Sequence, residues 1–160
     1  MRWDAMCELL GGEDRIDERT RNFNNSFNLN VNNGADEVWK GPSSESPGWH
    51  KDGWFFRHFL DSPEQALLCL VIWREIKPQS GGTFYAPDSV PLICRDLLAH
   101  PEGLPHTRGW GRFISECKDF REVTAETGDI IILHPFMLHA ASQNPSGRIR
   151  FMNNKAVSLT

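Results

Sequence analysis

Two side chains that can bind a metal, His50 and Asp52, are separated by one residue in the segment PGWHKDGWFF, residues 47–56. On a strand, residues two apart face the same side, so an imidazole nitrogen and a carboxylate oxygen would point at one place. His139 follows in the apolar segment IIILHPFMLHAA, residues 130–141, where an unpaired imidazole would be costly to bury. Two histidines and one carboxylate on one face of an iron are typical of non-haem Fe(II) oxygenases. The three residues are therefore a candidate metal site.

Other readings of these residues stay open. A lone His-x-Asp pair also occurs where two polar side chains simply cap a turn. His134 is a rival third ligand, although it lies five residues before His139, an odd offset that favours the opposite face of a regular strand. Pro135 could break that parity. His58 could reach the His50 segment only after a turn, so we expect it to be a partly exposed structural residue.

Two arginines follow the late histidine. Arg148 and Arg150 lie nine and eleven residues after His139, beyond a turn at residues 144–147. The strand that returns from this turn would run beside the His139 strand. A buried guanidinium needs an anion, and its planar fork suits a carboxylate. Parity places both arginines on one face, so periodicity does not choose between them.

The bulk composition is that of one soluble domain. The chain has 160 residues, 39% hydrophobic and 24% charged, with a net charge of -4. Lysines and arginines are scattered, which argues against nucleic acid or anionic membrane as a partner. No segment reaches the ~20 apolar residues of a membrane span, and the amino terminus lacks a secretory pattern. The four cysteines form no CxxC pair, so we expect reduced thiols in a cytoplasmic protein. We expect this protein to be a monomer or a weak homo-oligomer.

The elements that must position these residues are mostly short strands. Residues 27–32 alternate apolar and polar side chains, and residues 66–76 form a nearly continuous apolar run ahead of a Gly-Gly turn. Residues 88–100 predict a helix, with Pro91 in its first turn. Further strands are expected in three segments, residues 119–125, 130–141 and 148–159. This pattern predicts a mainly β fold, a sandwich or barrel with one or two short helices.

Three segments together resemble the phytanoyl-CoA dioxygenase-like family. They are WHKDG at residues 49–53, LVIWREIKPQSGGTFYAPDS at residues 70–89 and HAASQNPSGRIRF at residues 139–151. The resemblance implies a double-stranded β-helix of the jelly-roll or cupin type. It also implies an oxygenase that uses Fe(II), 2-oxoglutarate and O2.

The resemblance assigns the site residue by residue. It implies that His50, Asp52 and His139 hold the metal and are the catalytic centre. The arginine that binds the far carboxylate of 2-oxoglutarate matches Arg150 best. Halogenating relatives have a small residue where this chain has Asp52, so the resemblance implies hydroxylation or a related oxidation.

Further residues of the cosubstrate pocket are implied less directly. Trp73 matches an aromatic that lines this pocket, and Thr83 follows the glycine turn that borders it. Asn30, on the polar face of the first strand, could reach the cosubstrate or could face solvent. Where the family usually has PGSH after the turn, this chain has PDSV, so the role of that histidine is not carried over.

The expected function is therefore oxidation of a C–H bond in a small organic molecule by an Fe(II)- and 2-oxoglutarate-dependent dioxygenase. Residues 1–160 would form a single oxygenase-like domain, a minimal or truncated member, because only 49 residues precede His50. Two alternatives remain: a metal-binding β-helix that acts as an interaction module without turnover, and a cupin metalloenzyme that does not use 2-oxoglutarate.

Overall fold

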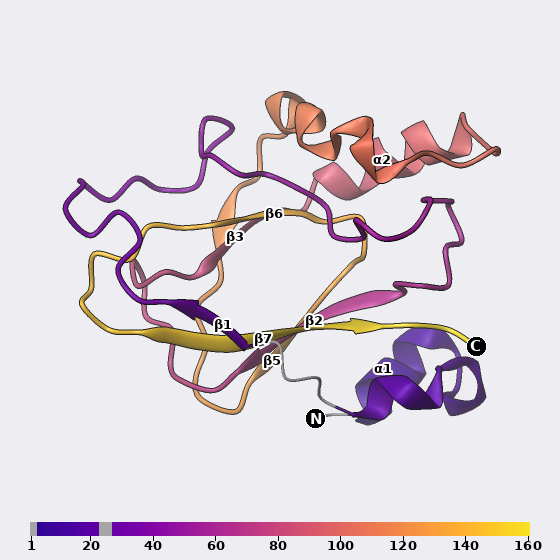
Figure 1. Cartoon of the computed structure of the whole chain (residues 1–160), viewed down its shortest axis with the longest axis horizontal. Coiled ribbons are helices and arrows are strands. Elements are labelled where there is room, and N and C mark those ends of the chain that lie inside the picture. The colour runs from indigo at the N-terminus through magenta and orange to yellow at the C-terminus, as the bar shows by residue number, and fades with distance from the viewer. Residues whose placement is uncertain (1–2, 23–26) are drawn as a thin grey trace.

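The strands form two antiparallel sheets that face each other (Figure 1). The computed structural model describes residues 3–22 and 27–160. The larger sheet has the strand order β1-β7-β2-β5 and the smaller one β4-β3-β6. The strands are β1 (Phe27–Asn30), β2 (Leu67–Ile72), β3 (Thr83–Ala86), β4 (Arg121–Glu122), β5 (Ile130–Leu133), β6 (Leu138–Ala141) and β7 (Arg150–Val157).

Helices cover the outer faces of both sheets (Figure 1). Helix α1 (Trp3–Leu10) lies against the larger sheet, where Met6 packs with Cys69 and Val157. Helix α2 (Ser89–Leu98) lies over the smaller sheet. Short 3-10 helices span Glu13–Arg15, Glu18–Arg21, His106–Arg108 and Trp110–Glu116.

Strand β2 is buried on both of its faces. Leu68, Leu70 and Ile72 pack between the two sheets with Met152 of β7, and Leu67 and Cys69 pack on the other side with Met6 of α1. A strand covered on both sides needs apolar residues at every position, which explains the continuous run in its sequence. The predicted mainly β, jelly-roll-like fold is confirmed.

The apolar segment of residues 130–141 is divided between the two sheets. Strand β5 pairs with β2 in the larger sheet, whereas β6 pairs with β3 in the smaller one. Between them the chain turns at residues 134–137, where the Met137 amide donates to the His134 carbonyl over 2.9 Å. The turn at Pro135 therefore ends one strand and starts the next, and His139 belongs to β6.

Other predicted elements differ in extent. The segment of residues 119–125 forms only the two-residue strand β4. Asp88 precedes α2, but its side chain makes no capping bond; one of its oxygens accepts from the Lys118 and Asp119 amides instead. All four cysteines are free thiols.

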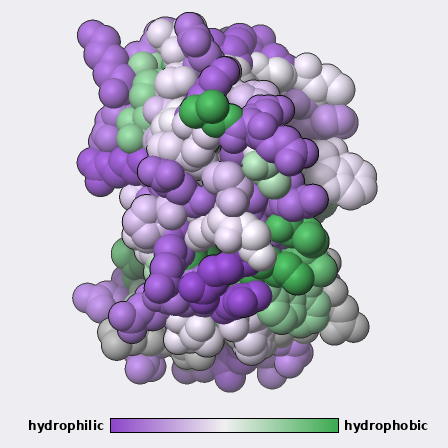
Figure 2. Space-filling view, turned by 90° about the vertical axis from the view of Figure 1, so that its left-hand side faces the viewer, coloured by the Kyte–Doolittle hydropathy of each residue, from purple (hydrophilic) through white to green (hydrophobic). Residues whose placement is uncertain are grey.

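The end of the molecule that carries the β6–β7 connection has a largely hydrophilic surface, and its largest hydrophobic patch lies at the lower right of the view (Figure 2). Three apolar side chains on and just after β1 are about half exposed, namely Phe27, Leu29 and Val31. No helix in the described part of the chain is long and apolar enough to cross a membrane.

Candidate metal and cosubstrate site

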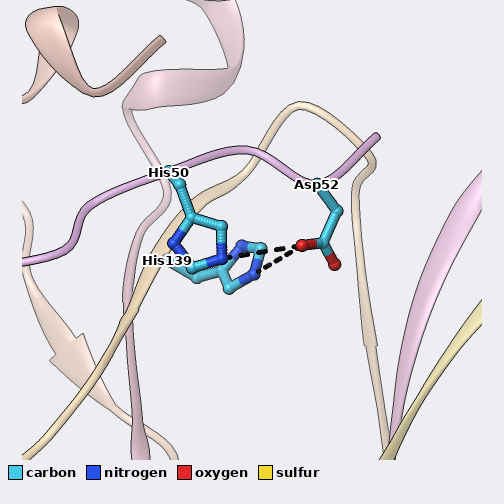
Figure 3. A group of neighbouring side chains, drawn as sticks. All are labelled: His50, Asp52 and His139. Atoms are coloured by element: carbon cyan, nitrogen blue, oxygen red, sulfur yellow. Dashed lines mark ion pairs between the residues drawn. The ribbon is translucent and has the colours of Figure 1, made fainter. Parts of the chain in front are cut away.

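His50, Asp52 and His139 converge at one place between the sheets (Figure 3). One potential ligand atom from each side chain lies within 4.8 Å of the other two. The same oxygen, Asp52 Oδ1, lies 3.6 Å from Nε2 of His50 and 3.6 Å from Nε2 of His139. The His139 side chain is 4% exposed, while those of His50 and Asp52 are 53% and 32% exposed. The group is thus closed on the His139 side and open on the His50 side.

The two histidines are neighbours because their backbones pair. The His50 amide donates to the His139 carbonyl over 3.0 Å, and the His139 amide returns a bond of 2.9 Å. This isolated bridge brings the two rings to a centroid distance of 4.4 Å. Asp52 lies beyond the bridge, in a bend rather than in the expected strand. Gly53 follows with φ 105°, which allows the sharp change of direction.

Backbone carbonyls orient both imidazoles. Nδ1 of His50 contacts the Gly48 carbonyl at 2.7 Å, and Nδ1 of His139 contacts the Met137 carbonyl at 3.1 Å. A carbonyl oxygen can only accept, so each Nδ1 carries the proton and each neutral ring keeps its lone pair on Nε2. Such second contacts are what metal-binding histidines commonly make. Nε2 of His139 is buried and has no hydrogen-bond partner among the described residues.

The charges favour a ligating state of the carboxylate. Burial opposes ionisation of Asp52, but the imidazoles of His139 and His50, each 3.6 Å from its Oδ1, hold its pKa well below the usual range. In return, Asp52 raises the pKa of His50. When both imidazoles are neutral, as in the tautomer set by Gly48 and Met137, the ionised carboxylate and two Nε2 lone pairs face one another. These are ligands for a divalent metal, and the buried Nε2 gains a partner if a metal binds.

Arg150 is buried at the start of β7, and no carboxylate among the described residues pairs with it. It is 8% exposed, and burial lowers its pKa. Its NH1 group donates to the sulfur of Met152 at 3.0 Å, and its Nε has no hydrogen-bond partner within the described chain. A thioether is a weak acceptor for a guanidinium. Arg150 also borders a cavity of about 360 Å³ together with Asn30 and Ala141.

Arg148 lies in a different environment, although the sequence could not separate the two arginines. It precedes β7, and its guanidinium lies 3.6 Å from Glu75 in a half-exposed ion pair. The shared face inferred from parity does not apply, because only Arg150 is part of the strand.

The other residues predicted to line the cosubstrate pocket, Thr83, Trp73 and Asn30, lie in three different environments. Thr83 is buried, and its hydroxyl donates to the sulfur of Met152 at 3.9 Å, beside Arg150. Trp73 is 42% exposed, and its ring centroid lies 6.1 Å from that of Phe27. Asn30 is buried; its side-chain nitrogen donates to the Ser142 carbonyl, and its Oδ1 accepts from the backbone amide of Asn33. Its side chain therefore fastens β1 to the chain after β6.

The remaining histidines lie outside the triad. His134 sits in the turn after β5, where its Nδ1 accepts from the Phe136 amide at 3.1 Å. His58 is 1% exposed, so the expectation of a partly exposed residue was wrong. The reason is Lys51, whose ammonium lies 2.7 Å from Nδ1 of His58 in the interior. The sequence analysis singled out neither Lys51 nor Met152 as a site residue. The available signal for them was their place in the sequence: Lys51 is next to His50, and Met152 is two residues after Arg150.

A comparison with known protein families identifies the family of this chain. The chain matches the model of the family described as phytanoyl-CoA dioxygenase (PhyH) over residues 13–152. The chain therefore belongs to this family, and the resemblance noted in its sequence is confirmed. The class expected from the sequence, that of 2-oxoglutarate-dependent non-haem iron oxygenases, is the class of this family.

Solved structures show the same fold at low sequence identity. EvdMO1 is similar with a TM-score of 0.50 and 16% identity, over 82% of this chain and 25% of that one. The α-ketoglutarate-dependent epimerase SnoN from nogalamycin biosynthesis is similar with a TM-score of 0.50 and 18% identity, over 82% of this chain and 46% of that one. This chain thus spans less than half the length of either. No curated protein matches it in sequence.

Proposed function

We propose that this chain is an Fe(II)- and 2-oxoglutarate-dependent dioxygenase that oxidises a C–H bond of a small organic molecule. The observation that carries the proposal is the convergence of His50, Asp52 and His139 with their potential ligand atoms within 4.8 Å. The buried Arg150, which pairs with no carboxylate of the described residues, supports the same reading. Family membership supplies the identity of the metal and of the cosubstrate.

The protein's part in the reaction is to hold and orient. His50, Asp52 and His139 would occupy one face of the iron, which leaves the remaining positions for the 2-oxo acid and O2. The Nδ1 bonds to Gly48 and Met137 keep both rings in the tautomer that can ligate. When bound, the iron and 2-oxoglutarate supply an oxidation by O2 that is coupled to release of succinate and CO2.

Arg150 would hold the far carboxylate of 2-oxoglutarate. Its NH1 and the Thr83 hydroxyl now share the sulfur of Met152. A carboxylate is a far better acceptor for both donors, because a charge-assisted bond in a dry site is stronger than a contact with a thioether. Binding of the cosubstrate would therefore also neutralise a buried positive charge.

The test is release of succinate from 2-oxoglutarate by the purified chain under Fe(II) and O2, with a panel of small metabolites as co-oxidised substrates. We expect metal-dependent succinate release that one or more metabolites accelerate, with an oxidised product detected by mass spectrometry. His139→Ala is the matched variant and should release none. Metal binding without any succinate release would instead support the interaction-module alternative. Turnover of a metabolite without 2-oxoglutarate would support the cupin alternative.

A further inference from the structure

Asp52 needs a support that the sheet does not provide. His50 is fixed by its backbone pair with His139, but Asp52 lies two residues further on, in a bend. Within the described chain, its carboxylate forms ion pairs only with the two imidazoles, each at 3.6 Å. A ligand on a bend keeps its place only if its backbone is held by other contacts.

Lys51 provides such a contact from the opposite side of the chain. Its ammonium donates to the main-chain carbonyl of Asp52 at 3.1 Å. It also lies 2.7 Å from Nδ1 of His58. Lys51 is only 7% exposed, although lysine is rarely buried without a partner. The ammonium thus contacts two acceptors inside the protein, Nδ1 of His58 and the carbonyl of Asp52, and Asp52 is one of the candidate metal ligands.

The surroundings of Lys51 are built for a cation. Its ammonium lies over the rings of Phe56, Trp110 and Phe136, at 5.5, 5.9 and 5.5 Å from their centroids. No carboxylate side chain is within ion-pair distance of it in the described part of the chain. Aromatic faces attract a cation without fixing its direction, so the two hydrogen bonds set where the ammonium points.

His58 connects this arrangement to the rest of the fold. Its amide donates to the Leu104 carbonyl and its carbonyl accepts from the Leu104 amide, both at 2.8 Å. His58 is therefore anchored by backbone pairing that does not involve the metal ligands. Through Lys51, this anchor reaches the Asp52 peptide.

We propose that Lys51 is a positioning residue for the metal site, which holds the Asp52 peptide against His58 so that the carboxylate faces His50 and His139. The inference rests on the proposed function, since it assumes that these three residues bind a metal. A side chain that only filled the aromatic pocket would satisfy the packing but would leave the Asp52 carbonyl without its donor.

The experiment is a titration of the metal-free chain of residues 1–160 with Co(II), followed by visible absorption, with thermal unfolding recorded in parallel. Lys51→Met keeps the length and apolar stem while removing the donor. His58→Phe keeps a ring but removes the acceptor, and serves if Lys51→Met does not fold. Lys77→Met is the matched control, because Lys77 is a half-exposed surface residue.

We expect Lys51→Met and His58→Phe to raise the dissociation constant for Co(II) roughly 10–100-fold, the usual effect of losing a contact behind a metal ligand. Lys77→Met should bind as the unmodified chain does. If the unmodified chain binds Co(II) and either folded variant binds it equally well, Lys51 only fills space and the inference is wrong. If the unmodified chain binds no Co(II), the metal site itself, and with it this inference, is refuted.

Discussion

At the scale of single residues, the site depends on which side chains lack a partner. Nε2 of His139 and Nε of Arg150 are both buried and unpartnered in the described chain, and both were predicted from the sequence. The sequence prediction of this ligand set rests on residue type and approximate spacing. It could not distinguish Arg148 from Arg150, because the start of β7 depends on pairing with β1 and β2 rather than on local alternation.

Replacing Asp52 by Ala should abolish oxidation of the substrate. One of three protein ligands is lost, and the anionic ligand contributes most to the attraction of a divalent ion. Dissociation of Fe(II) from Asp52→Ala, followed with a chelator, should be much faster than from the unmodified chain.

The unmodified chain should give hydroxylated and no chlorinated product in chloride buffer, since Asp52 occupies the position that a halide would need. Full activity of Asp52→Ala would reduce this residue to a turn cap.

Replacing Arg150 by Ala should raise the KM for 2-oxoglutarate far more than replacing Arg148 does. The first change leaves the cosubstrate carboxylate buried without its charge partner, which costs about 2–3 kcal/mol or more. The second removes only an exposed ion pair with Glu75. Steady-state kinetics of both variants at varied 2-oxoglutarate concentration measure the difference. The opposite order would transfer the role to Arg148.

At the scale of elements, the turn between β6 and β7 sets the position of Arg150. The sequence predicted this turn, but not the contacts that hold it. Asn144 is fully buried, and its amide nitrogen donates to the carbonyls of Asn30 and Arg148, both at 2.8 Å. Asn30 is more than a hundred residues from Asn144 in the sequence, and Arg148 lies on the other side of the turn. No local sequence pattern could reveal these two contacts. The same limit applies to Asp52, which alternation placed on a strand and the structure places in a bend.

Replacing Asn144 by Ala should therefore destabilise the protein and weaken cosubstrate binding together. Buried carbonyls of β1 and of the turn would lose their donor, at about 1–3 kcal/mol of the free energy of unfolding. Urea denaturation measures this loss, and the KM for 2-oxoglutarate should rise as Arg150 loses its support. Asn32→Ala, at an exposed position nearby, is the control. A stability loss with an unchanged KM would show that the turn does not position Arg150.

At the scale of the whole molecule, two sheets with helices on their outer faces enclose a mainly apolar interior in which a few polar groups lie. The mainly β fold could be predicted because apolar runs, alternation and Gly/Pro turns are local signals. Which strands pair, and which polar groups become buried, depends on the whole chain. His58 illustrates this, since its burial follows from Lys51 and from pairing with Leu104.

His58 should make the folded protein sensitive to acid. Burial, and then the charge of Lys51, lower the pKa of His58 to about 4, from 6.5. Below pH ~6.5 the unfolded chain binds a proton that the folded chain does not, so the free energy of unfolding falls as the pH is lowered toward 4. Between pH 7 and pH 5 this residue accounts for about 2 kcal/mol. Urea denaturation of the metal-free protein should show a smaller decrease over this range for His58→Phe; an equal decrease would assign the effect to other groups.

The central claim is that one metal site and one buried arginine together bind 2-oxoglutarate. Calorimetric titration of 2-oxoglutarate into the Fe(II)-loaded chain without O2 tests it most directly. We predict one binding site that weakens sharply in the metal-free chain, in His139→Ala and in Arg150→Ala, while Arg148→Ala binds as the unmodified chain does. Absence of binding to the Fe(II)-loaded chain, or binding that is indifferent to the metal and to Arg150, would contradict the account.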